Sequence, residues 1–228
     1  MKQESKPQAA AILPVSRSKE EARQFYDRIS RFYDCLAGIF ERKYAKRTLQ
    51  NLSIQDGETV LEIGFGSGYC LKRIAQSVGY RGQACGIDIS PGMLEVTKKR
   101  LEKPQLGDRV KLYCGDAATL PYNENTFDAV FTSFTLELFD IPEISTVLSE
   151  VKRVLKPDGR LGVVSLSRSR GESTLLRLYE WTHKKWPKYA DCRPIYVEEA
   201  LIDAGYRIQS KKEARLVGLP IESIIARI

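Results

Sequence analysis

Three glycines and one acidic residue are spaced so that they could bind a nucleoside. A short apolar run, residues 59–63, ends abruptly at Gly64, Gly66 and Gly68, and a helical pattern follows. A buried strand that leads through a glycine turn into a helix places backbone N–H groups where they can hold a polar or anionic ligand group. Asp88 ends the next apolar run, twenty positions after Gly68. A carboxylate at the end of the second strand of a nucleotide-binding sheet reaches the ribose hydroxyls.

The glycine spacing also discriminates between classes of nucleoside ligand. A dinucleotide-binding turn needs glycine or alanine at its third small position, so that helix and strand can pack closely. Counted from Gly64, that position is the bulky Tyr69, and an acid, Glu62, lies two residues before the first glycine. This pattern disfavours NAD binding, and an NAD-dependent oxidoreductase is kept as the less favoured alternative. The simplest alternative is an ordinary strand–turn–helix in which Asp88 caps a helix.

Composition limits the class of protein. The chain has 228 residues, 43% of them hydrophobic, which suits one α/β domain with a sizeable core. No run approaches the ~20 apolar residues of a membrane-spanning helix. Residues 1–17 indicate a disordered leader and not a signal peptide. The five cysteines show no metal-ligand spacing, so we expect reduced thiols, no metal and a cytoplasmic protein.

The formal net charge of +7 is unevenly distributed. Basic residues gather at 42–47 and around Trp186. Nucleic-acid-binding surfaces can show such clusters. The sequence has no zinc module, no stacking-aromatic motif and no long basic stripe, so we expect no nucleic-acid partner. Solvated helix faces explain the clusters most simply, and peripheral contact with an anionic membrane surface is the alternative. The pattern leaves the oligomeric state undetermined.

The elements that must position these residues alternate between strands and helices. Helices are predicted from Gly68, Pro91 and Pro142. The first five predicted strands are residues 59–63, 83–87, 110–113, 127–132 and 160–165. This alternation predicts an α/β fold, a Rossmann-like doubly wound sheet that is mostly parallel, with helices on both faces.

The remaining segments complete the predicted domain, residues 18–228. A short helix at 197–204 precedes strands at 206–212 and 221–228, which predict a C-terminal antiparallel hairpin and a total of seven strands. The Pro-Asp-Gly at 157–159 predicts a turn between a helix and the fifth strand. Two long stretches lie outside the alternation, a helical pattern at 20–50 and an aromatic segment at 170–196. We expect these two stretches to cap the cleft and keep water out.

Four successive motifs resemble those of the class I S-adenosylmethionine-dependent methyltransferases. They lie, in the family's order and spacing, at residues 60–68, 86–93, 115–130 and 150–159. Within that family the chain is similar to the ubiquinone/menaquinone biosynthesis C-methyltransferases. The similarity rests on the Leu-Pro-Tyr that begins at Leu120 and leads to Phe-Asp, and on a Tyr-Asp pair that occurs twice before residue 35. The resemblance covers residues 24–165, and the sequence departs from the quinone-ring enzymes at 134–139 and after 165.

The resemblance implies S-adenosylmethionine as the cofactor and gives roles to individual residues. Asp88 would accept hydrogen bonds from both ribose hydroxyls. Asp116, with the Ala117 N–H, would bind the adenine, and Glu62 would orient the amino group of the methionine. The other cofactor-binding residues that we expect are Tyr33, Gly64, Phe65, Gly66, Gly68, Ile89, Met93 and Ser133.

The expected reaction is methyl transfer to a small lipophilic acceptor, a quinone-type or phenolic ring carbon. Aromatic residues in both cap segments favour an apolar pocket. The only histidine, His183, is the candidate general base, because a phenol that activates its ring must lose a proton. A histidine on a surface helix is the simpler interpretation of His183. The alternatives are N- or O-methylation of a lipid head group or secondary metabolite, and a non-catalytic cofactor-binding protein.

Overall fold

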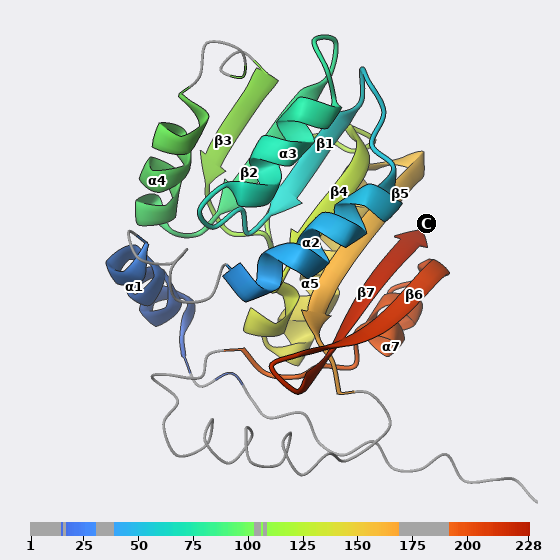
Figure 1. Cartoon of the computed structure of the whole chain (residues 1–228). Coiled ribbons are helices and arrows are strands. Elements are labelled where there is room, and N and C mark those ends of the chain that lie inside the picture. The colour runs from blue at the N-terminus through green and yellow to red at the C-terminus, as the bar shows by residue number, and fades with distance from the viewer. Residues whose placement is uncertain (1–14, 16, 31–38, 103–105, 107–108, 169–191) are drawn as a thin grey trace, which may run out of the picture.

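A seven-stranded sheet forms the centre of the computed structural model, which describes residues 15, 17–30, 39–102, 106, 109–168 and 192–228. The strand order is β3-β2-β1-β4-β5-β7-β6 (Figure 1). The strands are β1 (Thr59–Ile63), β2 (Gln83–Asp88), β3 (Val110–Cys114), β4 (Phe127–Ser133), β5 (Leu155–Leu166), β6 (Arg207–Leu216) and β7 (Leu219–Arg227). The helices within the described residues are α1 (Lys19–Ile29), α2 (Ile39–Leu52), α3 (Tyr69–Ser77), α4 (Pro91–Leu101), η3 (Leu136–Leu138), α5 (Ile141–Val154) and α7 (Val197–Asp203).

The sheet has the predicted mixture of strand directions. The strands β3, β2, β1, β4 and β5 pair in parallel, and β7 pairs antiparallel with both β5 and β6. The chain moves outward from β1 to β2 and β3, then returns to place β4 on the other side of β1. Open α/β sheets bind ligands at such a reversal of strand order, outside the carboxyl ends of the strands. The prediction of a doubly wound sheet with a C-terminal hairpin is confirmed.

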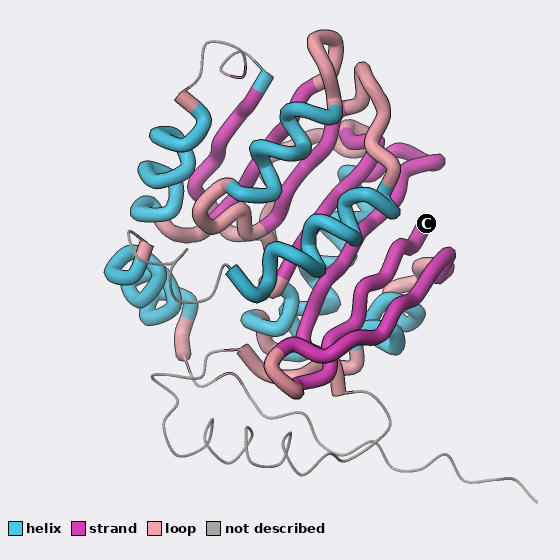
Figure 2. Tube along the Cα trace, viewed as in Figure 1, coloured by secondary structure: helices cyan, strands magenta, loops and turns pink. Residues whose placement is uncertain are grey.

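Helices cover both faces of the sheet, as Figure 2 shows. Successive residues of a strand point to opposite faces, and β1 follows this rule. Val60 packs in a core cluster with α2, α3 and α4, whereas Leu61 packs in a second cluster with α5 and α7. Both residues are fully buried. No helix in the described part of the chain is long and apolar enough to span a membrane.

Two boundaries differ from the sequence-based expectation. The predicted turn at 157–159 is wrong, because β5 begins at Leu155, which pairs with Phe127 before the register shifts and pairing resumes at Arg160. The Pro-Asp-Gly therefore forms an irregularity inside β5. The hairpin turn is also shorter than predicted, since β7 begins at Leu219. Val217 and Gly218, with φ of 49° and 85°, form a two-residue turn whose geometry matches the twist of the strands.

The cap segments are described only in part. In residues 20–50 the structure describes two helices, α1 and α2, and residues 31–38 between them lie outside the description. Most of segment 170–196, including residues 170–191, lies outside the described residues as well. The leader, the domain limits and the capping role of these segments stay predictions.

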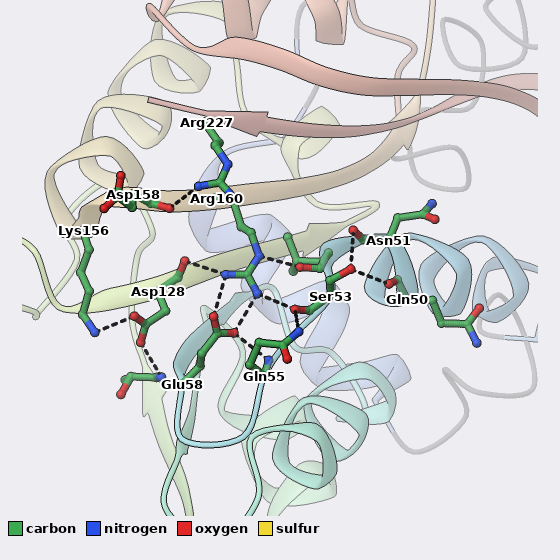
Figure 3. A network of polar contacts seen from close by, with 12 residues as sticks. Gln50, Asn51, Ser53, Gln55, Glu58, Asp128, Lys156, Asp158, Arg160 and Arg227 are labelled. Carbon is green, nitrogen blue, oxygen red and sulfur yellow. Dashed lines mark hydrogen bonds and ion pairs between the residues drawn. The ribbon is translucent and has the colours of Figure 1, made fainter.

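A polar network joins several elements at the amino ends of the parallel strands (Figure 3). The Arg160 guanidinium donates to both carboxylate oxygens of Glu58, at 2.9 and 2.7 Å. It also donates to the carbonyls of Leu52, the last residue of α2, and of Ser53, the next residue, at 2.6 and 3.0 Å. The last carbonyls of a helix have no partner within the helix. This network therefore caps the C-terminus of α2 and connects the helix to β1 and β5.

Candidate active site

A cavity of about 360 Å³ opens at the carboxyl ends of β1, β2 and β4. Its position is the one that the reversal of strand order predicts for a ligand. Eight of the residues expected to bind the cofactor line it, namely Gly64, Gly66, Asp88, Ile89, Met93, Asp116, Ala117 and Ser133.

A second cavity, of about 60 Å³, lies against the same glycine turn. Glu62 and Phe65 line this smaller cavity, while Gly64, Gly66 and Ser133 line both cavities. Thus Glu62 and Phe65 face a separate space from Asp88.

Of the other three expected residues, the structure describes only Gly68. Gly68 lines neither, and with φ of 77° it caps the N-terminus of α3. A Cβ atom on Gly68 would lie 2.6 Å from Thr97, so glycine is needed there for packing. Tyr33 and His183 lie outside the described residues.

The glycine turn brings the backbone close to the next strand. Gly64 and Gly66 have φ of 70° and 50°, a left-handed conformation that costs glycine little. A Cβ atom on Gly64 would lie 2.2 Å from the Thr135 side chain. The Gly66 N–H donates to Asp88 Oδ2 at 2.8 Å. The turn and the carboxylate are therefore held together before any ligand binds.

The carboxyl group of Asp88 has limited access to solvent. Its second oxygen, Oδ1, accepts the Ser90 N–H at 3.0 Å. Burial raises the pKa of Asp88 to about 6, although the N–H groups of Ser90 and Gly66 oppose that rise. Each carboxylate oxygen can accept a further hydrogen bond. The arrangement can therefore still receive two hydroxyl donors.

Glu62 is the most deeply buried acid of the glycine turn. Its exposed fraction is 3%, and burial raises the pKa of its carboxyl well above the ordinary value, with the charge of Asp88 adding to the rise. Within the described part of the chain, Glu62 Oε2 accepts no hydrogen bond. A buried acceptor without a donor is costly. The smaller cavity thus presents an acceptor that a ligand ammonium group can satisfy.

Helix α1 forms one wall of the larger cavity. The sequence did not predict this position for the helix. Ser18, Lys19, Ala22 and Tyr26 all line it. Lys19 Nζ lies 2.5 Å from Asp116 Oδ2 and also forms an ion pair with the carboxylate of a helix α5 residue, at 2.6 Å. The helical pattern predicted α1, but a lysine on its first turn carries no signal of such a distant pairing.

A second contact fixes the other end of α1. Asp27 Oδ1 accepts the Ser90 hydroxyl at 2.5 Å and the Gly92 N–H at 2.8 Å. Ser90 caps α4 through the Met93 N–H and also donates its own N–H to Asp88. The repeated Tyr-Asp pair was the available signal for Asp27. Its carboxylate connects α1 to the loop that carries Asp88.

The segment after β4 forms the opposite wall. Phe134, Leu138 and Phe139 give this wall an apolar surface, and Val15 adds to it. Glu137 holds the segment from behind, because its buried carboxylate accepts the Ser165 hydroxyl at 2.8 Å and the Leu166 N–H at 3.0 Å. Burial raises the pKa of Glu137 to about 7.

A buried arginine fixes the same wall from the C-terminal part of the chain. Arg193 is 1% exposed, and its guanidinium donates to the Phe139 carbonyl. It also lies 3.6 Å from Asp140 Oδ1, which accepts the Val15 N–H at 2.8 Å. Sequence reasoning missed Arg193, Glu137 and Asp140 because partners so distant along the chain leave no local pattern.

Comparison with known proteins reveals related sequences. A family model described as a methyltransferase domain matches residues 60–159. A demethylmenaquinone methyltransferase of Oceanobacillus iheyensis is 33% identical over 157 residues, which are 67% of this chain and 65% of that relative. The protein of the same name from Staphylococcus aureus strain JH9 is 36% identical over 157 residues, covering 67% of this chain and 62% of that relative. The chain thus spans somewhat less than two thirds of the length of these two relatives.

Solved structures share the fold at lower identity. A structure described as the [4+2]-cyclase SpnF superposes with a TM-score of 0.74, covering 96% of this chain and 98% of that one, at 19% identity. Its description names a cyclisation and not a methyl transfer. At this identity the likeness establishes the fold alone, and the reaction must be argued from the site and from the nearer relatives.

Proposed function

We propose that this chain transfers a methyl group from S-adenosylmethionine to a small lipophilic acceptor, as a class I S-adenosylmethionine-dependent methyltransferase. The observation that carries the proposal is the pair of cavities at the glycine turn. The larger cavity has Asp88 and Asp116 at successive strand ends. The smaller one has Glu62 Oε2, which accepts no hydrogen bond within the described residues.

The residues present suit S-adenosylmethionine. Asp88 would accept the ribose hydroxyls, and Asp116 would accept the adenine amino group beside Lys19. Ile89 and Met93 would cover the faces of the adenine with apolar surface, and Glu62 would accept the ammonium group of the methionine. The bound cofactor supplies an electrophilic methyl group, so the chain need only align the acceptor and exclude water. The walls formed by α1 and by residues 134–140 would do both.

The acceptor that we propose is a quinone-type or phenolic ring carbon. The names of the relatives support this choice, and so does the apolar wall with Val15, Leu138 and Phe139. His183 is proposed as the base that takes the phenolic proton, and Tyr33 as a cofactor contact. A cytoplasmic location with peripheral contact to an anionic membrane, which would give access to a lipophilic quinone, also belongs to this proposal.

Labelled cofactor offers a direct test of the reaction. The purified protein is incubated with S-adenosylmethionine carrying a labelled methyl group and with a lipid extract of its host, and the labelled product is isolated. We expect label on the ring of a quinone or phenol. Label only in a water-soluble amine, or only on a lipid head group, would favour the alternative of N- or O-methylation.

Ligand binding separates the remaining alternatives. We expect S-adenosylhomocysteine to raise the melting temperature and NAD to leave it unchanged, because only a bound ligand stabilises the fold. Stabilisation by NAD alone would favour an oxidoreductase. Stabilisation by S-adenosylhomocysteine without transfer to any acceptor would favour a non-catalytic cofactor-binding protein or another reaction on the same fold.

A further inference from the structure

The cavity wall formed by residues 134–140 departs from local backbone preferences at both of its ends. Phe134 has φ of 52°, a left-handed conformation that is unfavourable for a bulky residue. Asp140 is the N-cap residue of α5, yet its side chain makes no capping hydrogen bond, although an aspartate there ordinarily accepts an N–H of the first turn. Such departures persist only where surrounding contacts impose them. The contacts that impose them here come from two other segments.

The end of β5 holds the first half of the wall. The Phe134 N–H donates to the Val164 carbonyl at 2.8 Å. The Glu137 carboxylate accepts the Ser165 hydroxyl and the Leu166 N–H. Three successive residues of β5 therefore fix the wall from Phe134 to Glu137. The second half of the wall is supported from the C-terminal part of the chain.

Arg193 supports that second half from behind. Its guanidinium donates to the Phe139 carbonyl and lies 3.6 Å from Asp140 Oδ1. The backbone near Arg193 is itself fixed to the end of β5, because the Ile195 N–H donates to the Leu166 carbonyl at 3.2 Å. Arg193 is 1% exposed and does not line the cavity. It can therefore affect a ligand only by positioning the wall.

Asp140 extends this support to the N-terminal part of the chain. Its Oδ1 accepts the Val15 N–H at 2.8 Å and also faces Arg193. Val15 and Phe139 both line the larger cavity, so one guanidinium fixes two apolar residues that an acceptor would contact. Asp88 belongs to β2, which lies on the other side of β1 from β4. The nucleoside contacts and the wall thus depend on different strands.

We propose that Arg193 is a positioning residue for the methyl acceptor. By holding Phe139 and Asp140 in place, it determines which acceptor fits and how the acceptor ring is aligned for transfer. This inference rests on the proposed function, since it presumes methyl transfer to a lipophilic ring. It assigns acceptor specificity to a residue outside the range 60–159 that the methyltransferase family model matches.

Steady-state methyl transfer to 1,4-naphthoquinol, kept reduced with dithionite, tests the proposal. Arg193→Lys keeps the charge beside Asp140 but loses the planar guanidinium that pairs with a carbonyl and a carboxylate together. We expect kcat/KM for naphthoquinol to fall about tenfold or more, because a small misplacement of a reactant is costly in rate. The affinity for S-adenosylhomocysteine, measured by titration calorimetry, should stay within about twofold of the wild type, since distant sites act independently.

Arg160→Lys is the matched control. The Arg160 guanidinium also donates to a backbone carbonyl and pairs with a carboxylate, but at the amino ends of the strands. With the concentration of folded protein set by titration with S-adenosylhomocysteine, this variant should keep the wild-type kcat/KM for naphthoquinol.

The outcomes separate this inference from the proposed function. An unchanged kcat/KM in Arg193→Lys, or an equal loss in Arg160→Lys, would overturn the inference alone. A parallel fall in the affinity for S-adenosylhomocysteine would do the same, because Arg193 would then be a general structural residue. Wild-type protein that binds S-adenosylhomocysteine but transfers no methyl group to naphthoquinol would overturn the proposed acceptor and the inference with it.

A second variant covers the case in which Arg193→Lys does not fold. Asp140→Asn keeps an acceptor for the Val15 N–H and weakens the attraction to Arg193. It should also lower kcat/KM for naphthoquinol while the affinity for S-adenosylhomocysteine is retained. An unchanged kcat/KM in this variant would overturn the inference.

Discussion

Asp88 links the acidity of the site to its ligand affinity. Burial raises its pKa to about 6, and ribose hydroxyls donate to its ionised form, so binding should favour loss of its proton. We predict that the affinity for S-adenosylhomocysteine rises about tenfold per pH unit below pH 6 and levels off above it. Titration calorimetry between pH 5 and 8, in buffers of different ionisation enthalpy, measures both the affinity and the released proton.

Glu62 must be separated from Asp88 in that experiment, because its pKa is also raised and the two charges interact. Asp88→Asn should bind more weakly and lose the dependence around pH 6. Glu62→Gln should bind more weakly but keep it. A wild-type affinity that stays constant from pH 5 to pH 8, or an unchanged profile in Asp88→Asn, would contradict the ribose assignment.

Glu137 should make the stability of the protein depend on pH. Its folded-state pKa of about 7 exceeds the ordinary 4.5, so the folded state binds the proton more tightly. Its contribution to stability is then full below about pH 4.5 and is lost as the pH rises towards 7. Glu137→Gln keeps an acceptor for the Leu166 N–H and gains a donor for Ser165. We predict that this variant gains stability over the wild type by on the order of 3 kcal/mol between pH 4.5 and 8.

Urea unfolding at several pH values measures that difference. Glu137→Leu is the matched control, because it removes the acceptor of the buried Leu166 N–H and should be about 1–3 kcal/mol less stable than Glu137→Gln at every pH. A constant difference between Glu137→Gln and the wild type across the range would show that Glu137 does not titrate in the folded protein.

At the scale of elements, α1 is held to the site by side chains at both of its ends. Asp27 joins it to Ser90 and Gly92, and Ser90 in turn contacts Asp88. We predict that Asp27→Ala weakens S-adenosylhomocysteine roughly tenfold, since about 1–2 kcal/mol of hydrogen bonding to a charged group is lost. Amide hydrogen exchange should become faster in α1 and remain unchanged in α5.

The same helix supplies the control for that prediction. Glu20 and Arg23 form an exposed pair at 2.8 Å on α1, and such pairs add little to stability. Glu20→Ala should therefore leave both the affinity and the exchange rates of α1 as in the wild type. An equal loss of affinity in both variants would mean that any substitution in α1 weakens ligand binding, and that the contacts of Asp27 are not the cause.

The sequence predicted the strands far better than the contacts between distant elements. Short continuous apolar runs mark a buried strand wherever its neighbours are, so the central strands and the position of Asp88 could be read directly. The irregularity after Leu155 could not be predicted from the sequence. Pro-Asp-Gly is equally compatible with a turn, and only the pairing of Leu155 with Phe127 places it inside a strand. Arg193 and Lys19 depend on carbonyls and carboxylates more than fifty residues away, and such pairing leaves no periodic pattern.

At the scale of the whole molecule, stability and ligand binding are assigned to opposite ends of the sheet. The cavities lie at the carboxyl ends of the parallel strands. The network around Arg160 lies at their amino ends, where it joins α2, β1 and β5 (Figure 3). Arg160 is 11% exposed and its partner Glu58 is 18% exposed. A substitution at the amino ends of the strands should therefore change the stability of the protein and leave its ligand affinity unchanged.

Arg160→Met tests that separation. It leaves the Glu58 carboxylate and the carbonyls of Leu52 and Ser53 without their donors, so we predict a loss of about 2–4 kcal/mol in the free energy of unfolding. The affinity for S-adenosylhomocysteine should stay within about twofold of the wild type, measured well below the midpoint of unfolding. Lys156→Met is the control, because its ion pair with Asp128 is 43% exposed on the lysine side and should contribute less than about 1 kcal/mol. A marked fall in the affinity of Arg160→Met would show instead that the amino ends of the strands position the ligand site, and that the two ends of the sheet are coupled.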